Sequence, residues 1–177
     1  MVVQAPGGPD AYNVRVKIVL VMRRRRLPLL LALAFAAPAQ KYDGPRPPKK
    51  DIPYLKHATD LIPTEAVEAR QEGKKDDITF VIAGSSSPVV TPLAAPVFLM
   101  QAEKIAPDQI ELYKLDSKNG RRELQLARRK PARAIRLEVT RLTPDGLWKI
   151  EVGESLEPGE YSLSPKDSNQ TFCFQER

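Results

Sequence analysis

Apolar and polar side chains alternate with a period of two along most of the chain after Asp77. The alternation is clearest in three segments: ITFVIAG from Ile78, AIRLEVT from Ala134 and LWKIEV from Leu147. An apolar side and a polar side along each segment are typical of half-buried antiparallel strands. Weaker alternation predicts further strands near residues 96–101, 109–115, 121–126, 160–164 and 170–175.

The connections between these segments carry residues that favour tight turns. Asn119-Gly120 tolerates the positive φ of a short hairpin, and Pro144-Asp145-Gly146 joins two of the clearest strands. About eight short strands at such spacing predict an all-β fold, a single antiparallel immunoglobulin-like β-sandwich. The expected core residues are Phe80, Phe98, Leu112, Leu137, Trp148 and Tyr161.

The segment before Asp77 predicts a different organisation. Prolines recur between Gln40 and Pro63, which favours an extended Pro-rich arm, and the apolar residues of IPYLKHATDLI leave open whether it lies along the domain. Thr64 is placed to cap a short helix over residues 64–73, and KKDD then predicts a domain boundary. The expected parts are a leader (1–39), the arm with its helix (40–76) and the sandwich (77–177).

The leader has the pattern of a secretory signal peptide over residues 22–39. Four arginines from Arg23 precede an apolar run over 27–37, and Ala37-Pro38-Ala39 supplies small residues for cleavage. The run is far shorter than the ~20 residues that a membrane-spanning helix needs. We therefore expect a soluble exported protein, periplasmic or extracellular, with residues 1–21 a start-site extension before Met22. A genuine extended leader is the alternative.

Charge changes this picture once the leader is set aside. The whole chain has a net charge of +6, which would suggest a nucleic-acid partner. Six basic residues and one acidic residue belong to the leader, so 22 basic and 21 acidic residues remain of the 28 and 22 in the chain. A net charge of about +1 gives no general reason to expect nucleic acid as a partner.

The segment LEPGEYSL, residues 156–163, carries a resemblance. Pro158-Gly159 suits a type II turn, and Tyr161 opens a strand after it. The pattern resembles the L-x-P-G-x-Y-x-L element of many immunoglobulin-like and transthyretin-like sandwiches, which implies a structural tyrosine corner at Tyr161. With TPLAAPVFL and IELYKL, the wider run is similar to uncharacterised exported bacterial proteins, and the likeness implies no activity. Trp148 is expected to be structural too.

The sequence offers little for catalysis. The chain contains one histidine and one cysteine, which cannot supply a site of several imidazoles or thiolates, so we expect no metal and no cofactor. GSSSP from Gly84 has no partner that could activate a hydroxyl, and the carboxylates at Asp145, Glu154 and Glu157 fall in predicted turns. A non-catalytic protein is the better interpretation.

Cys173 and a basic cluster remain as candidate features. An unpaired thiol in an exported protein is either a buried, inert side chain or an intermolecular thiol, and burial is favoured. If strands 121–126 and 134–141 form a hairpin, their connection is a basic finger that could bind an anionic polymer, a lipid head group or an acidic protein surface. The alternative is a solvated loop that discourages edge-to-edge pairing of sheets. The candidate binding residues are Arg121, Arg122, Arg128, Arg129, Lys130, Arg133 and Arg136.

These features predict a non-catalytic interaction module of the cell envelope that binds an anionic polymer or a protein partner through the basic loop. One alternative is a structural subunit of an oligomer or filament, in which the arm or the strand over residues 172–175 adds to a neighbour's sheet. A hydrolase that uses carboxylates is the other alternative.

Overall fold

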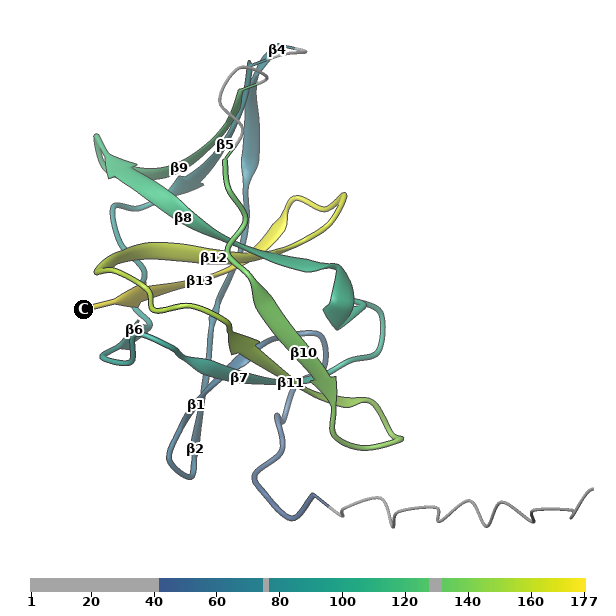
Figure 1. The fold of residues 1–177 in the computed structure, drawn as a ribbon. Helices are drawn as coiled ribbons and strands as arrows, with labels where there is room; N and C mark the ends of the chain where they lie inside the picture. The colour runs from purple at the N-terminus through teal and green to yellow at the C-terminus, as the bar shows by residue number, and fades with distance from the viewer. Residues whose placement is uncertain (1–41, 75–76, 128–131) are drawn as a thin grey trace, which may run out of the picture. The chain divides into compact units, whose positions relative to one another are not determined.

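The computed structural model describes residues 42–74, 77–127 and 132–177, which belong to one compact unit, Ala39–Arg177. These residues form two nearly all-antiparallel β-sheets that pack together as a sandwich, as the alternation predicts (Figure 1). The leader lies outside the described residues, as do Arg128, Arg129 and Lys130 of the basic cluster.

The first sheet has five strands. In spatial order they are β10 (Leu137–Arg141), β11 (Leu147–Val152), β7 (Val97–Gln101), β1 (Tyr54–His57) and β2 (Asp60–Pro63). The predicted turn at Pro144-Asp145-Gly146 joins β10 to β11, and Gly146 has a φ of 90°, which suits glycine. The range predicted from LWKIEV coincides with β11.

The second sheet has eight strands. Seven of them form the order β3 (Glu65–Glu68), β13 (Gln170–Glu176), β12 (Gly159–Pro165), β8 (Ile110–Lys118), β9 (Arg121–Ala127), β5 (Asp77–Ala83) and β4 (Arg70–Lys74). The short β6 (Val90–Thr91) pairs with β13 in parallel. A 3₁₀ turn, Pro107–Gln109, precedes β8.

Strand β8 changes partners along its length. Its residues from Ile110 to Leu115 pair with β12, whereas Asp116 to Lys118 pair with β9. The β8–β9 hairpin turns at Asn119-Gly120 with φ of 53° and 73°, as predicted. As a result β9, β5 and β4 form a ribbon that rises away from β12 and β13 (Figure 1). We call these three strands the ribbon.

The main core lies between the two sheets. Phe98, Tyr161 and Phe174 are buried, with ring centroids of Phe98 and Phe174 5.1 Å apart and those of Tyr161 and Phe174 5.5 Å apart. The Tyr161 hydroxyl donates a hydrogen bond to the Glu157 carbonyl at 2.6 Å, which confirms the expected tyrosine corner. The type II turn is wrong, because Gly159 has a φ of 158°.

The predicted core is correct in part. Phe98, Leu112 and Tyr161 are fully buried, and Leu137 packs against them. Trp148 is only half-buried, since its cross-strand partner is Arg141, whose guanidinium lies 5.8 Å from the Trp148 ring centre. Phe80 belongs instead to a second apolar cluster beneath the ribbon.

Residues 54–63, predicted as the end of an extended arm, are built into the fold. Strand β1 lies between β7 and β2, and its Tyr54 and Leu55 are buried. The Asp51 carboxylate fixes the approach to β1 by accepting backbone N–H bonds from residues 103–105. Apolar side chains in IPYLKHATDLI bury this segment against β7, so of the two placements that the sequence left open the segment lies along the domain, as paired strands rather than as a separate arm.

The predicted helix over residues 64–73 is also wrong. The segment forms β3 and β4, and the Thr64 hydroxyl donates to the Pro53 carbonyl at 2.7 Å instead of capping a helix. Lys74 at the end of β4 pairs with Asp77 at the start of β5, so the strands that flank residues 75–76 belong to one hairpin and the predicted domain boundary is wrong. Gly73 suits its place in this hairpin, since its φ is 97° and an added Cβ would lie 2.0 Å from the Asp77 carbonyl oxygen.

Candidate functional site

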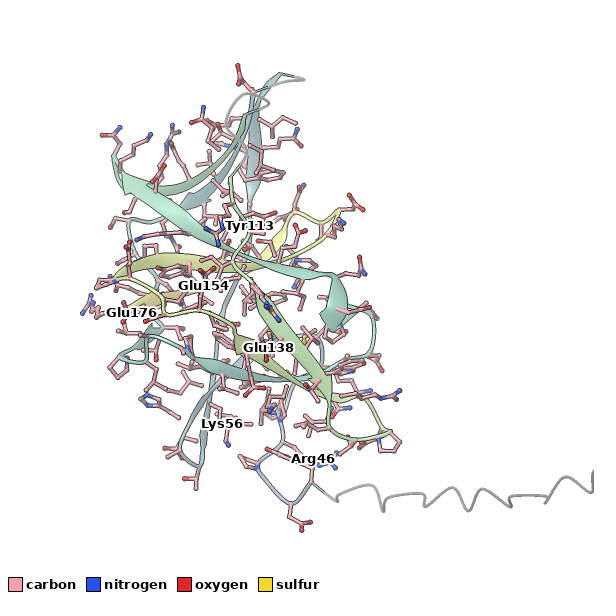
Figure 2. The ribbon with its side chains drawn as sticks, in the orientation of Figure 1. Arg46, Lys56, Tyr113, Glu138, Glu154 and Glu176 are labelled. Carbon is pink, nitrogen blue, oxygen red and sulfur yellow. The ribbon has the colours of Figure 1, made fainter. Side chains whose placement is uncertain are left out.

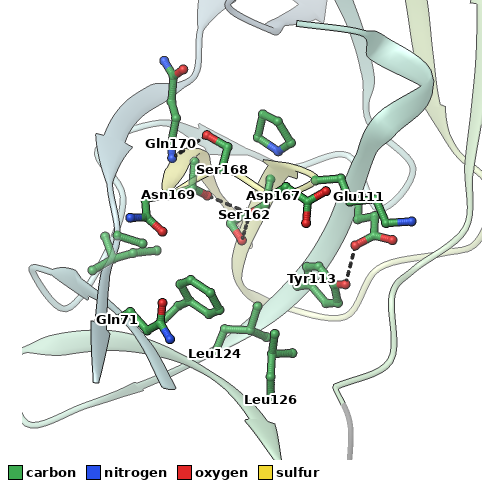
Figure 3. A pocket seen from close by; sticks show the side chains of 17 residues that line it. Gln71, Glu111, Tyr113, Leu124, Leu126, Ser162, Asp167, Ser168, Asn169 and Gln170 are labelled. Carbon is green, nitrogen blue, oxygen red and sulfur yellow. Dashed lines mark hydrogen bonds between the residues drawn. The ribbon is translucent and has the colours of Figure 1, made fainter. Parts of the chain in front are cut away.

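A pocket of about 470 Å³ lies between the ribbon and the face of the second sheet that points away from the main core (Figure 3). Leu124 and Leu126 bound it on one side, and Ser162 and the loop over residues 166–169, which joins β12 to β13, bound it on the other. We call this space the ribbon pocket. Its volume falls within the ~300–1,000 Å³ of small-molecule sites.

The base of the pocket is polar because of the register of three strands. Ser164 on β12 lies opposite Glu111 on β8, and Ser162 lies opposite Tyr113. The hydroxyl of Ser164 is 3.2 Å from that of Ser162 and 3.0 Å from that of Thr171 on β13. These three hydroxyls, with Glu111 and Tyr113, form what we call the polar base.

The opposite side of the pocket is apolar because the register of β5 and β9 places their apolar side chains on the same face of the ribbon. Phe80 pairs with Leu124, and its other cross-strand partner is Gln71 on β4. Side chains on one face of the ribbon therefore form rows that cross the three strands. The apolar wall comprises Phe80, Ile82, Leu124 and Leu126.

Tyr113 and Glu111 lie at the edge of the polar base, on the part of β8 that pairs with β12; Figure 2 labels Tyr113 and Figure 3 labels both. The Tyr113 hydroxyl donates to a Glu111 carboxylate oxygen at 2.7 Å. Burial, together with this bond to a carboxylate, raises the pKa of Tyr113 to about 12. The hydroxyl therefore stays protonated at neutral pH and acts as a donor rather than a base.

A buried ion cluster adjoins the polar base. The Arg122 guanidinium, fully buried, donates to both Glu65 carboxylate oxygens at 2.6 and 3.1 Å and to the Ala83 and Gly84 carbonyls. Glu160 lies 3.8 Å from the same guanidinium and accepts the Ser87 N–H at 2.9 Å. The cluster joins β9, β3 and β12, so it fixes the base of the ribbon to the sheet.

Glu160 gives the cluster a pH dependence. Burial raises the pKa of Glu160, while the Ser87 N–H and Arg122 only partly oppose this. The folded state then holds the proton more tightly than the unfolded state, so the contribution of Glu160 to stability falls as pH rises above its ordinary value of 4.5. We expect the free energy of unfolding of the wild type, minus that of Glu160→Gln, to fall over this range in denaturant titrations. A difference that rises with pH would contradict this.

Cys173 is fully buried beside this cluster and carries no disulfide. It lies opposite Ser162 on β12 and Glu65 on β3. Burial raises the pKa of the Cys173 thiol to about 12, only partly opposed by Arg122. The thiolate, the reactive form, is therefore scarce at neutral pH, and a bridge to another molecule would require β3 or the ribbon to open.

We expect the folded protein to show no reaction of Cys173 with iodoacetamide at pH 8, because the thiol is both inaccessible and protonated. In concentrated urea the same reagent should add one carboxamidomethyl group, seen in the intact mass. Prompt labelling of the folded protein, or a reducible dimer in its unreduced mass, would show that the thiol is accessible.

The described members of the basic cluster do not form a finger. Strands β9 and β10 lie in different sheets, so the predicted hairpin between them is wrong. Arg122 is buried, and each of the others has a carboxylate partner: Arg121 pairs with Glu72 and Glu123, Arg133 with Glu154, and Arg136 with Glu138. These four arginines therefore present no joint unpaired surface.

The strand over residues 172–175 is not available for exchange either. It forms part of β13, which is paired by β12 on one side and by β3 and then β6 on the other. In the folded unit this strand therefore offers no free edge to which a neighbour's sheet could add.

Sequence reasoning missed the ribbon pocket, although one signal was present. In RRELQLA, Arg122, Leu124 and Leu126 are two residues apart, so their side chains point to the same face of the strand. Arg122 therefore belongs to the apolar face and not to a charged surface. The serines of β12 gave no such signal, because they form the base of a pocket only where the ribbon covers that face of the sheet.

Comparisons with protein families, curated proteins and solved structures give no match to this chain. Among the described residues, no three or more His, Cys, Asp or Glu side chains are grouped so that they could hold a metal ion. No helix in the described ranges has the length and apolar character to cross a membrane.

Proposed function

We propose that the chain is an exported, non-catalytic binding module whose ligand occupies the ribbon pocket. The observation that carries the proposal is the pocket itself, which combines an apolar wall, a base of hydroxyl groups and a rim of amides in about 470 Å³. Such a combination is typical of sites that bind and orient a small ligand.

The chemistry at the pocket supports binding over catalysis. The hydroxyls of Ser162, Ser164 and Thr171 bond to one another, and no imidazole lines the pocket to activate them. Cys173, the one nucleophile of higher intrinsic reactivity, is buried and protonated. Recognition needs only the donors, acceptors and apolar surface that are already in place.

A binding panel tests this function. The purified protein is titrated in ligand-detected NMR with maltotriose, triacetylchitotriose, decanoate, spermidine and N-acetylphenylalanine amide. Gln71→Trp should block the pocket, because Gln71 lines it from an exposed strand where a large side chain is tolerated. Gln125→Trp is the matched control, since Gln125 is exposed on the same ribbon but does not line the pocket.

We expect at least one panel compound to bind the wild type and the control variant but not Gln71→Trp. The proposal is rejected if no compound binds, or if binding is unchanged in Gln71→Trp. Conversion of any compound to a product, detected in the same spectra, would contradict the non-catalytic part of the proposal.

A further inference from the structure

We infer that the ligand of the ribbon pocket is a neutral saccharide unit, held with one face of its ring against Phe80 and its hydroxyl groups toward the polar base. This inference rests on the proposed function and names the chemistry of its ligand.

The two sides of the pocket require a ligand with two kinds of surface. The apolar wall contains the aromatic ring of Phe80, and the base offers hydroxyls that can each donate and accept. A long alkyl chain would match only the apolar wall, and it would leave unused the donor and acceptor capacity that remains on the hydroxyls after they bond to one another. A sugar ring has an apolar C–H face and a periphery of hydroxyls, so it matches both sides.

The rim reinforces this match. Gln71 of the ribbon, Asn169 and Gln170 contribute amides to the rim, and Asp167 contributes a carboxylate beside that of Glu111 in the polar base (Figure 3). An amide can donate one hydrogen bond and accept another, and a carboxylate can accept two hydrogen bonds through its two oxygens. The rim can therefore bond to neighbouring hydroxyl groups of a ligand, each of which is both donor and acceptor.

Charge argues against an anionic ligand. Glu111 and Asp167 line the pocket, whereas Lys166 is the only cationic residue among the described lining residues. The lining is therefore net negative, and a carboxylate or phosphate would meet repulsion. A neutral ligand avoids this repulsion without needing a countercharge.

The strands beneath the pocket argue against a peptide bound as an added strand. Both β12 and β13 are interior strands, so their backbone groups are already paired. A peptide bound by strand addition needs a free sheet edge. The base of the pocket offers side chains alone, which suits a ligand recognised through hydroxyl groups.

A second hollow suggests that the ligand is a segment of a chain of sugars. It is lined by Ala66, Val67 and Glu68 together with residues 167–170, which also line the ribbon pocket. The same loop thus borders two adjacent spaces. Two neighbouring units of an oligosaccharide could lie on either side of it, one in each space.

Isothermal titration calorimetry with maltotriose and with triacetylchitotriose tests the inference. We expect one of these neutral trisaccharides to bind. Phe80→Leu keeps an apolar side chain but removes the aromatic face, and it should weaken that binding by up to about tenfold. Gln71→Ala should weaken binding by a few fold through loss of a hydrogen bond, whereas Gln125→Ala should leave it unchanged.

The outcomes separate the inference from the function on which it rests. If neither trisaccharide binds but decanoate, spermidine or N-acetylphenylalanine amide binds in a Gln71→Trp-sensitive way, the saccharide inference is overturned and the binding function stands. If no compound binds at all, both are overturned. Saccharide binding that is unaffected by Phe80→Leu and Gln71→Ala would place the sugar elsewhere and also overturn the inference.

Discussion

Arg122→Ala should lower the free energy of unfolding by about 3–5 kcal/mol, because it leaves Glu65 and Glu160 in the protein interior without their cation. Arg122 also donates to the Ala83 and Gly84 carbonyls, which would lose their partner as well. A loss of this size is a large fraction of the ~5–15 kcal/mol that stabilises a typical domain. Urea denaturation, followed by tryptophan fluorescence, measures it.

Arg136→Ala is the matched control for this prediction. Arg136 is exposed and pairs with Glu138, also exposed, at 3.5 Å, so its removal should change the free energy of unfolding by less than about 1 kcal/mol. If Arg122→Ala were as mild as the control, the ion cluster would not hold the ribbon to the sheet.

Leu55→Ala should lower the free energy of unfolding by about 2–5 kcal/mol, because its side chain is fully buried in the main core. This substitution distinguishes two placements of residues 54–57: as β1 inside the first sheet, or in an arm that does not pack against the domain. In an arm of that kind, truncation of Leu55 would leave stability nearly unchanged. Chemical denaturation of the purified variant gives the answer.

Leu93→Ala serves as the control for the core prediction. Leu93 is 41% exposed in the loop before β7, so its truncation should cost no more than about 0.5 kcal/mol. Equal effects of the two substitutions would contradict the placement of β1 inside the first sheet.

The sequence predicts the strands after Asp77 well, because several of these strands have one buried face and one face that is more exposed. In LWKIEV, Ile150 and Val152 are buried and Glu151 between them is only half-buried, so period-two alternation records the environment of this part of the strand. The hairpin at Asn119-Gly120 was equally predictable, because positive φ restricts the choice of residue.

The N-terminal part and the site were less predictable because tertiary contacts decide them. Residues 64–68 favour a helix only when considered alone, whereas in the fold Glu65 meets Arg122 and β3 pairs with β13. The ribbon pocket depends on β8 changing partners at Asp116, since this lifts β9 away from β12. No local pattern in the sequence marks that change.

Amide chemical-shift mapping tests most directly whether ligand binds in the ribbon pocket. The ¹⁵N-labelled protein is titrated with the panel compound that binds most tightly. We predict that the largest shifts fall on Phe80, Leu124, Ser164 and residues 167–171, which line the pocket. Shifts confined to the five-stranded sheet, or no shifts at all, would contradict the account.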